Sequence, residues 1–105
     1  MESVESKLAV IGRHADRAAA AVREDRGASP VLAAVVDEFA AKAKKLNAAF
    51  AGADAATRRE LIVEVEQAGD SAKAGAGADT GISKETKHLI VLAHDSFCLL
   101  KAESK

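Results

Sequence analysis

Apolar side chains follow one another at intervals of 4, 3, 4, 3 and 4 residues between Leu32 and Phe50, and this spacing constrains the fold most. An α-helix turns once in about 3.6 residues, so the alternation places all of them on one side of a helix. Residues 4–22 repeat the same spacing. A seam of this kind is typical of amphipathic helices that bury one face against other helices.

Capping signals predict where the helices begin and end. Ser29 followed by Pro30 is a strong start signal, and Asp54 is a suitable cap for the next helix. Gly27 and Gly52 follow the first two seams, where glycine commonly ends a helix. We therefore expect helices at about residues 3–26, 30–51, 54–74 and 83–102.

Composition supports helix along the whole chain. Alanine, the strongest helix former, fills 25 of the 105 positions. Residues 61–66 are β-branched and partly alternating, but a lone strand has no partner here, so we interpret them as helix. The four segments predict an all-α, antiparallel (up-down) four-helix bundle that forms a single domain over residues 1–105. Three glycines within residues 75–81 predict a flexible glycine-rich loop before the last helix.

The last predicted helix, residues 83–102, is the most apolar, and we expect it to lie deepest, with Leu99 in its buried half. A second group of residues lies opposite this half, or at the margin of that opposite side. Its members are Val91, His94, Asp95, Cys98 and Ala102. A helix with two apolar sides needs a second partner. We therefore expect a homodimer, or contact with an unidentified protein partner, through this group.

Two residue pairs suggest an alternative function as a metal- or ligand-binding bundle. Glu85 and His88 form a Glu-x-x-His unit, which di-iron bundles use twice together with two further glutamates, but the chain has no second copy. His94 and Cys98 are one helical turn apart, a spacing that lets both bind a soft divalent metal. A histidine phosphotransfer module with His94 as acceptor is a third possibility, although the usual Leu-Lys-Gly does not follow this histidine.

No residue pattern predicts catalysis or a bound cofactor. Enzymes present a nucleophile at a sharp turn or in a cleft, whereas Cys98 falls in the middle of a predicted helix. We therefore expect a small non-enzymatic protein that acts as a scaffold, an adaptor or a regulatory module.

Charge and hydropathy argue against nucleic acids and membranes as partners. Fifteen basic residues are interspersed with 16 acidic ones, and the net charge is −1. No run approaches the roughly 18 apolar residues that span a bilayer. Residues 1–5 lack the basic start and apolar stretch of a secretory signal, and Cys98 has no second cysteine for an internal disulfide. We expect a cytoplasmic protein.

Overall fold

The computed structural model describes residues 3–103, in which each of four helices starts at a capping side chain. Ser3, Ser29 and Asp54 each accept a hydrogen bond from the backbone N–H three residues later, at 3.1, 3.1 and 2.8 Å. Ser83 caps the last helix in the same way, at 3.1 Å. Each bond satisfies one N–H group that the first turn leaves without an intrahelical partner, so the caps fix where the helices begin.

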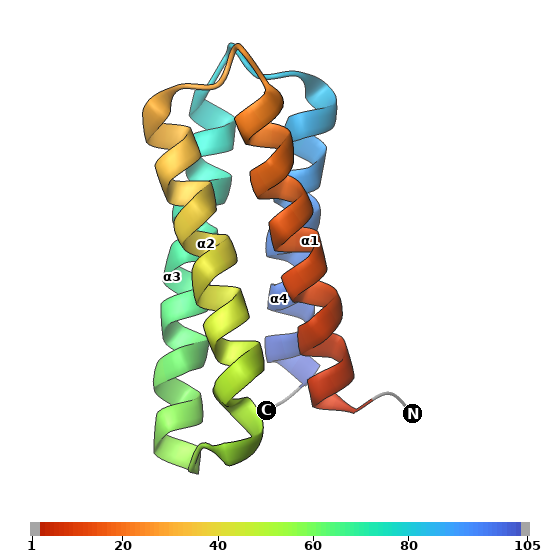
Figure 1. The fold of residues 1–105 in the computed structure, drawn as a ribbon, viewed down its shortest axis with the longest axis vertical. Coiled ribbons are helices and arrows are strands. Elements are labelled where there is room, and N and C mark those ends of the chain that lie inside the picture. The colour runs from red at the N-terminus through yellow and green to blue at the C-terminus, as the bar shows by residue number, and fades with distance from the viewer. Residues whose placement is uncertain (1–2, 104–105) are drawn as a thin grey trace.

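The helices run up and down in sequence order (Figure 1). They are α1 (Val4–Glu24), α2 (Pro30–Ala49), α3 (Ala55–Ala78) and α4 (Lys84–Glu103). A short 3-10 helix, η1 (Phe50–Gly52), begins the turn from α2 to α3 at the lower end of the bundle in Figure 1. Each helix packs on its sequence neighbours, and α1 also packs on α4. The predicted all-α, up-down four-helix bundle is confirmed.

Most of the small buried side chains lie on α1 and α3, whereas most of the largest fully buried side chains lie on α2 and α4. α1 and α3 together bury six alanines and Gly69, which lets neighbouring helices approach closely. The largest side chains that are fully buried include Phe39 and Leu32, both on α2, and Ile90 on α4. Burying a side chain of this size stabilises the fold by roughly 1.5–3 kcal/mol. The apolar seams read from the sequence are therefore the seams that pack.

α3 is longer than the sequence predicts, because it continues through Gly75 and Gly77 to Ala78. The glycine-rich loop expected at residues 75–81 is correspondingly shorter, and only residues 79–83 are non-helical between α3 and α4. A Cβ at Gly75 would lie 3.2 Å from Leu32 Cδ1, so the glycine brings α3 close to α2. Ala76 beside it is fully buried. This packing outweighs the low helix propensity of glycine.

α4 lies no deeper than the other helices, contrary to expectation. It buries one side, which includes Ile90, Ala93 and Phe97, as its neighbours do. Leu99, expected in the buried half, is 62% exposed. In a bundle of four helices from one chain each helix has two neighbours, so no helix is surrounded.

The two loops at the upper end of the bundle repeat one sequence motif. Residues 25–29 join α1 to α2 and residues 79–83 join α3 to α4, and both read Asp-x-Gly-x-Ser. The loops meet at the apex in Figure 1. A Cβ on Gly27 would lie 1.8 Å from the carbonyl oxygen of Gly81, and a Cβ on Gly81 would lie 2.3 Å from the carbonyl oxygen of Gly27. Glycine is therefore needed at both positions, because the two backbones touch.

The repeat extends from the loops into the core. Buried positions recur in the second half at the interval that separates Asp25 from Asp79. The corresponding buried pairs include Ile11 and Val65, Ala18 and Ala72, Val22 and Ala76, Val36 and Ile90, and Leu46 and Leu100. Two pairs exchange sizes, since Phe39 corresponds to Ala93 and Ala43 to Phe97. At these two positions each half of the chain contributes one phenylalanine and one alanine, so the core holds one aromatic ring from each half without overcrowding.

Candidate functional site

The side of α4 that faces away from the core carries the group expected to bind a partner. Asp95 and Ala102 are exposed, and Val91 and Cys98 are half-buried. Leu99, expected in the buried half of the helix, is the one large apolar side chain of α4 that is exposed among the described residues. We call these five residues the outer face of α4. They form a narrow stripe that is apolar except for the carboxylate of Asp95.

His94, predicted to lie at the margin of this stripe, instead lies in the seam between α3 and α4. Its side chain is 12% exposed and both ring nitrogens contact carboxylates. Nε2 is 2.8 Å from Asp70 Oδ1, and Nδ1 is 2.9 Å from Asp95 Oδ1. Each ring nitrogen of His94 therefore has a carboxylate oxygen within hydrogen-bond distance. Asp70 was missed from the sequence because it lies on another helix and no local pattern links it to His94.

Gly69 makes room for this seam. A Cβ at Gly69 would lie 3.1 Å from the ring of Phe39 and 3.6 Å from Cδ2 of His94. The buried ring of Phe39 and the imidazole of His94 thus pack on the same glycine of α3. The conformation of His94 is set by this packing as well as by its two carboxylates.

Two side chains next to His94, those of Asp95 and Cys98, have shifted pKa values. The hydrogen bond from His94, followed by the charge of Lys73, lowers the pKa of Asp95. Burial raises the pKa of the Cys98 thiol, and the negative charges of Asp70 and Asp95 raise it further. A thiol with a raised pKa is protonated at neutral pH, and the neutral thiol is a poor nucleophile. The side chains around His94 are therefore suited to hydrogen bonding and packing.

The two ligand pairs expected from the sequence lie at different positions along α4. Sγ of Cys98 is 3.7 Å from Nε2 of His94, and the nitrogens of that ring already face carboxylates. Glu85 and His88 are both exposed near the start of α4. Within residues 3–103, no group of three or more His, Cys, Asp or Glu side chains is arranged to hold a metal ion.

The upper end of the bundle is held by reciprocal hydrogen bonds between the two loops. Asp25 Oδ2 accepts from the backbone N–H of Ser83 at 3.0 Å, and Asp79 Oδ2 accepts from that of Ser29, also at 3.0 Å. Each carboxylate also accepts from the glycine of its own loop. The hydrogen bond from the N–H of Ser83 is the largest cause of the lowered pKa of Asp25. The hydrogen bond from the N–H of Ser29 is the largest cause of the lowered pKa of Asp79. The loops therefore cross-link the two halves of the chain.

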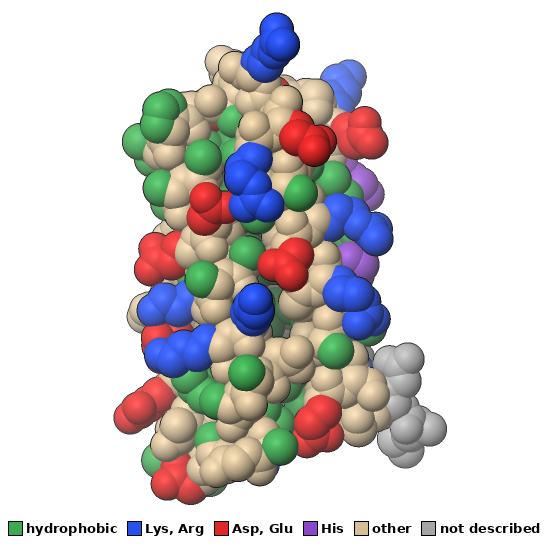
Figure 2. Space-filling model, in the orientation of Figure 1, with side chains coloured by type: hydrophobic (Ala, Val, Ile, Leu, Met, Phe, Trp, Pro, Cys, Tyr) green, Lys and Arg blue, Asp and Glu red, His purple; other side chains and the backbone are tan. Residues whose placement is uncertain are grey.

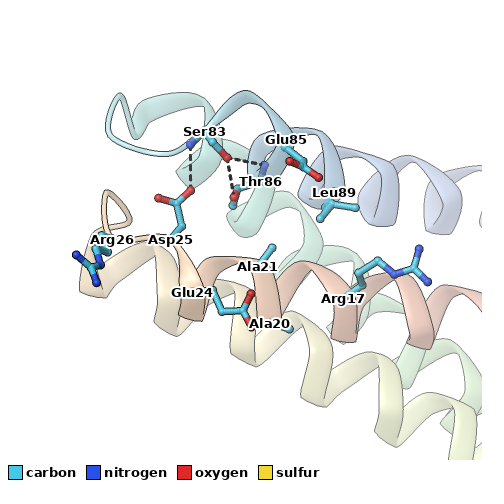
Figure 3. A pocket seen from close by; sticks show the side chains of 10 residues that line it. All are labelled: Arg17, Ala20, Ala21, Glu24, Asp25, Arg26, Ser83, Glu85, Thr86 and Leu89. Atoms are coloured by element: carbon cyan, nitrogen blue, oxygen red, sulfur yellow. Dashed lines mark hydrogen bonds between the residues drawn. The ribbon is translucent and has the colours of Figure 1, made fainter.

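A hollow of about 560 Å³ lies beside these loops, between α1 and α4 (Figure 3). Asp25 points toward Ser83, and Ser83 also binds Thr86, the one buried polar side chain among those that the structure describes. Charged side chains of both signs line the hollow, among them Arg17 and Glu85. The mixed charges favour neither an anionic nor a cationic ligand.

The remaining surface carries interspersed charges. Figure 2 shows acidic and basic side chains side by side over the face formed by α1 and α2. Lys42 Nζ binds Glu64 Oε1 at 2.8 Å, and this hydrogen bond raises the pKa of Lys42 and lowers that of Glu64. Arg23 pairs with Asp37 at 3.2 Å. In the part of the chain that the structure describes, no helix has the length and apolar character needed to cross a bilayer.

Fold and surface together define an up-down four-helix bundle of two similar hairpins with a stripe of apolar residues along its last helix. Comparison with known proteins finds no matching family model, no matching curated protein and no matching solved structure.

Proposed function

We propose that this chain is a non-enzymatic scaffold, adaptor or regulatory module that works through protein–protein contact, by forming a homodimer through the outer face of α4. The observation that carries the proposal is the 62% exposure of Leu99 on that face. Val91, Cys98 and Ala102 extend the apolar stripe along the helix. Removing such a stripe from water is the main favourable contribution to association of two helices.

The arrangement of the stripe favours a second copy as the partner. It lies along one helix, and a two-fold axis across that helix would place the same residues of two copies against each other, as in most soluble homodimers. Asp95 lies within the stripe, and Lys73 of the same chain is 3.6 Å from its carboxylate. Its charge is therefore already compensated before a partner binds. We also propose a reducing, cytoplasmic location, because a free thiol such as that of the half-buried Cys98 is typical of such a compartment.

Gel filtration with light scattering tests this proposal. We expect the unmodified chain to have twice its 10.8 kDa chain mass. Leu99→Glu places a charge in the contact and reduces the mass to that of one chain. Val31→Glu is the matched control, because Val31 is 72% exposed but lies on α2, away from the outer face of α4. Loss of the dimer in both variants, or in neither, would place the contact elsewhere.

A further inference from the structure

The lower end of the bundle contains a pocket that the outer face of α4 does not include. Its volume is about 420 Å³, within the range of small-molecule sites. The upper end is closed by two crossing loops, whereas at the lower end the described part of the chain has one connection between helices, from η1 into α3. The end of the core thus faces a recess between α1, α3 and α4.

The floor of the pocket is apolar. Leu8, Phe97 and Leu100 form its deepest part, and each is at most 6% exposed. Half-buried Phe50 and Ile62 continue it toward the rim. An apolar chain placed here would remove both its own surface and these side chains from water, at roughly 25 cal/mol per Å² of buried apolar area.

The rim of the pocket is cationic. Lys7, Arg58, Arg59 and Lys101 line it, and among the residues that the structure describes no carboxylate belongs to the lining. Glu66 binds Lys101 just outside, and the guanidinium groups of Arg58 and Arg59 keep the described part of the rim positive. The pocket therefore combines an apolar interior with a positive entrance, and this combination fits a molecule with a hydrocarbon tail and an anionic head.

Contacts of Arg58 with the turn after α2 fix the position of part of the rim. Its guanidinium carbon lies 4.2 Å from the centre of the Phe50 ring, and its Nε donates to the backbone carbonyl of Phe50 at 2.8 Å. A second bond, at 3.4 Å, reaches the carbonyl of Ala51. These contacts hold Phe50 and the cation above it in place at the start of the turn. Arg59, next to it in α3, is exposed and faces the same pocket.

We propose that this pocket binds a linear aliphatic carboxylate, with the tail against Leu8 and Phe97 and the carboxylate at Arg59. The bidentate geometry of a guanidinium matches a carboxylate. This site is independent of the proposed dimer, because its residues face the end of the core and not the outer face of α4.

Titration of ¹⁵N-labelled protein with dodecanoate, followed by NMR and calorimetry, tests the proposal. We expect saturable one-to-one binding, with amide shifts concentrated at Phe50, Arg59 and Phe97. Acetate, which lacks the tail, and dodecyltrimethylammonium, which reverses the charge, should give no saturable shifts at these amides. Absence of saturable dodecanoate binding would overturn the proposal. Equal binding of the ammonium compound would overturn it too.

Arg59→Gln separates a specific site from non-specific adsorption. We expect it to weaken dodecanoate binding about fivefold, which is the upper range for one exposed ion pair. Arg13→Gln is the matched control, since Arg13 is an exposed arginine of α1 outside the pocket lining. An equal effect of the two substitutions would show that net charge, and not this pocket, governs binding.

Discussion

Replacing Gly27 with alanine tests how the upper end of the bundle is closed. The new Cβ would lie 1.8 Å from the carbonyl oxygen of Gly81, whereas real Cβ contacts essentially never fall under 3.0 Å. The loops must therefore separate by about 1.2 Å, the difference between these two distances. Neither atom is the end of a flexible side chain, so only a backbone movement relieves the clash.

The size of the effect follows from that movement. Overpacking of a tight contact costs about 1–3 kcal/mol. The bonds from Ser83 to Asp25 and from Ser29 to Asp79 cross the same gap at 3.0 Å, and a shift of this size lengthens them beyond a normal hydrogen bond. We therefore expect the upper part of the range, about 2–3 kcal/mol. For a domain of this size that lowers Tm by more than roughly 8 °C.

Urea and thermal unfolding, followed by far-UV circular dichroism, measure this difference. Gly12→Ala is the matched control, because a Cβ at Gly12 meets nothing within 4 Å and the residue lies inside α1. Alanine there should stabilise the protein by roughly 1 kcal/mol, since glycine is the poorer helix former. A Gly27→Ala variant as stable as the unmodified protein would refute the proposed contact between the two loops.

Three further predictions concern stability and reactivity. Phe39→Ala removes a fully buried ring and should cost about 3–5 kcal/mol in urea unfolding, and a loss below 1 kcal/mol would contradict the described core. Asp25 and Asp79 have lowered pKa values in the folded state, so their stabilisation is complete above about pH 4 and is lost as the pH falls below it. The double variant Asp25→Asn and Asp79→Asn should therefore flatten the acid limb of the stability–pH curve, and an unchanged limb would disprove this role. Cys98, whose pKa is raised by burial, should react with iodoacetamide more slowly in the folded protein than in urea; equal rates would contradict its placement.

The architecture was predictable because its signals are local. Ser29 and Pro30 start a helix by capping and by a fixed backbone angle, whatever lies nearby. The regular apolar seam of α2, from Leu32 to Leu46, similarly defines one face without knowledge of its neighbours. These features determine four amphipathic helices, and short connections leave antiparallel packing as the simple arrangement.

The errors arose where tertiary contacts decide the outcome. Gly75 is a poor helix former, yet its lack of a side chain lets α3 pack on Leu32, so the helix continues. Leu99 lies at the edge of the broad apolar half of the helical wheel, and the residue is 62% exposed in the structure. Residue type misled the prediction at Gly75, and the width of the apolar half misled it at Leu99.

The candidate sites were less predictable than the fold. The contact between His94 and Asp70 joins two helices, and no spacing within either helix reveals it. The pocket at the lower end likewise combines residues from three helices, with Arg58 and Arg59 on α3. By contrast, the repeated Asp-x-Gly-x-Ser motif was visible in the chain and could have been found by comparing its two halves.

The mass of the unmodified chain in solution tests the proposed function most directly. Sedimentation across a wide dilution series, with interference optics because the chain has no Trp or Tyr, gives this mass without labels. The proposal predicts twice the chain mass of 10.8 kDa at the higher concentrations, with reversible dissociation on dilution. A mass of one chain at every concentration would contradict self-association through the outer face of α4.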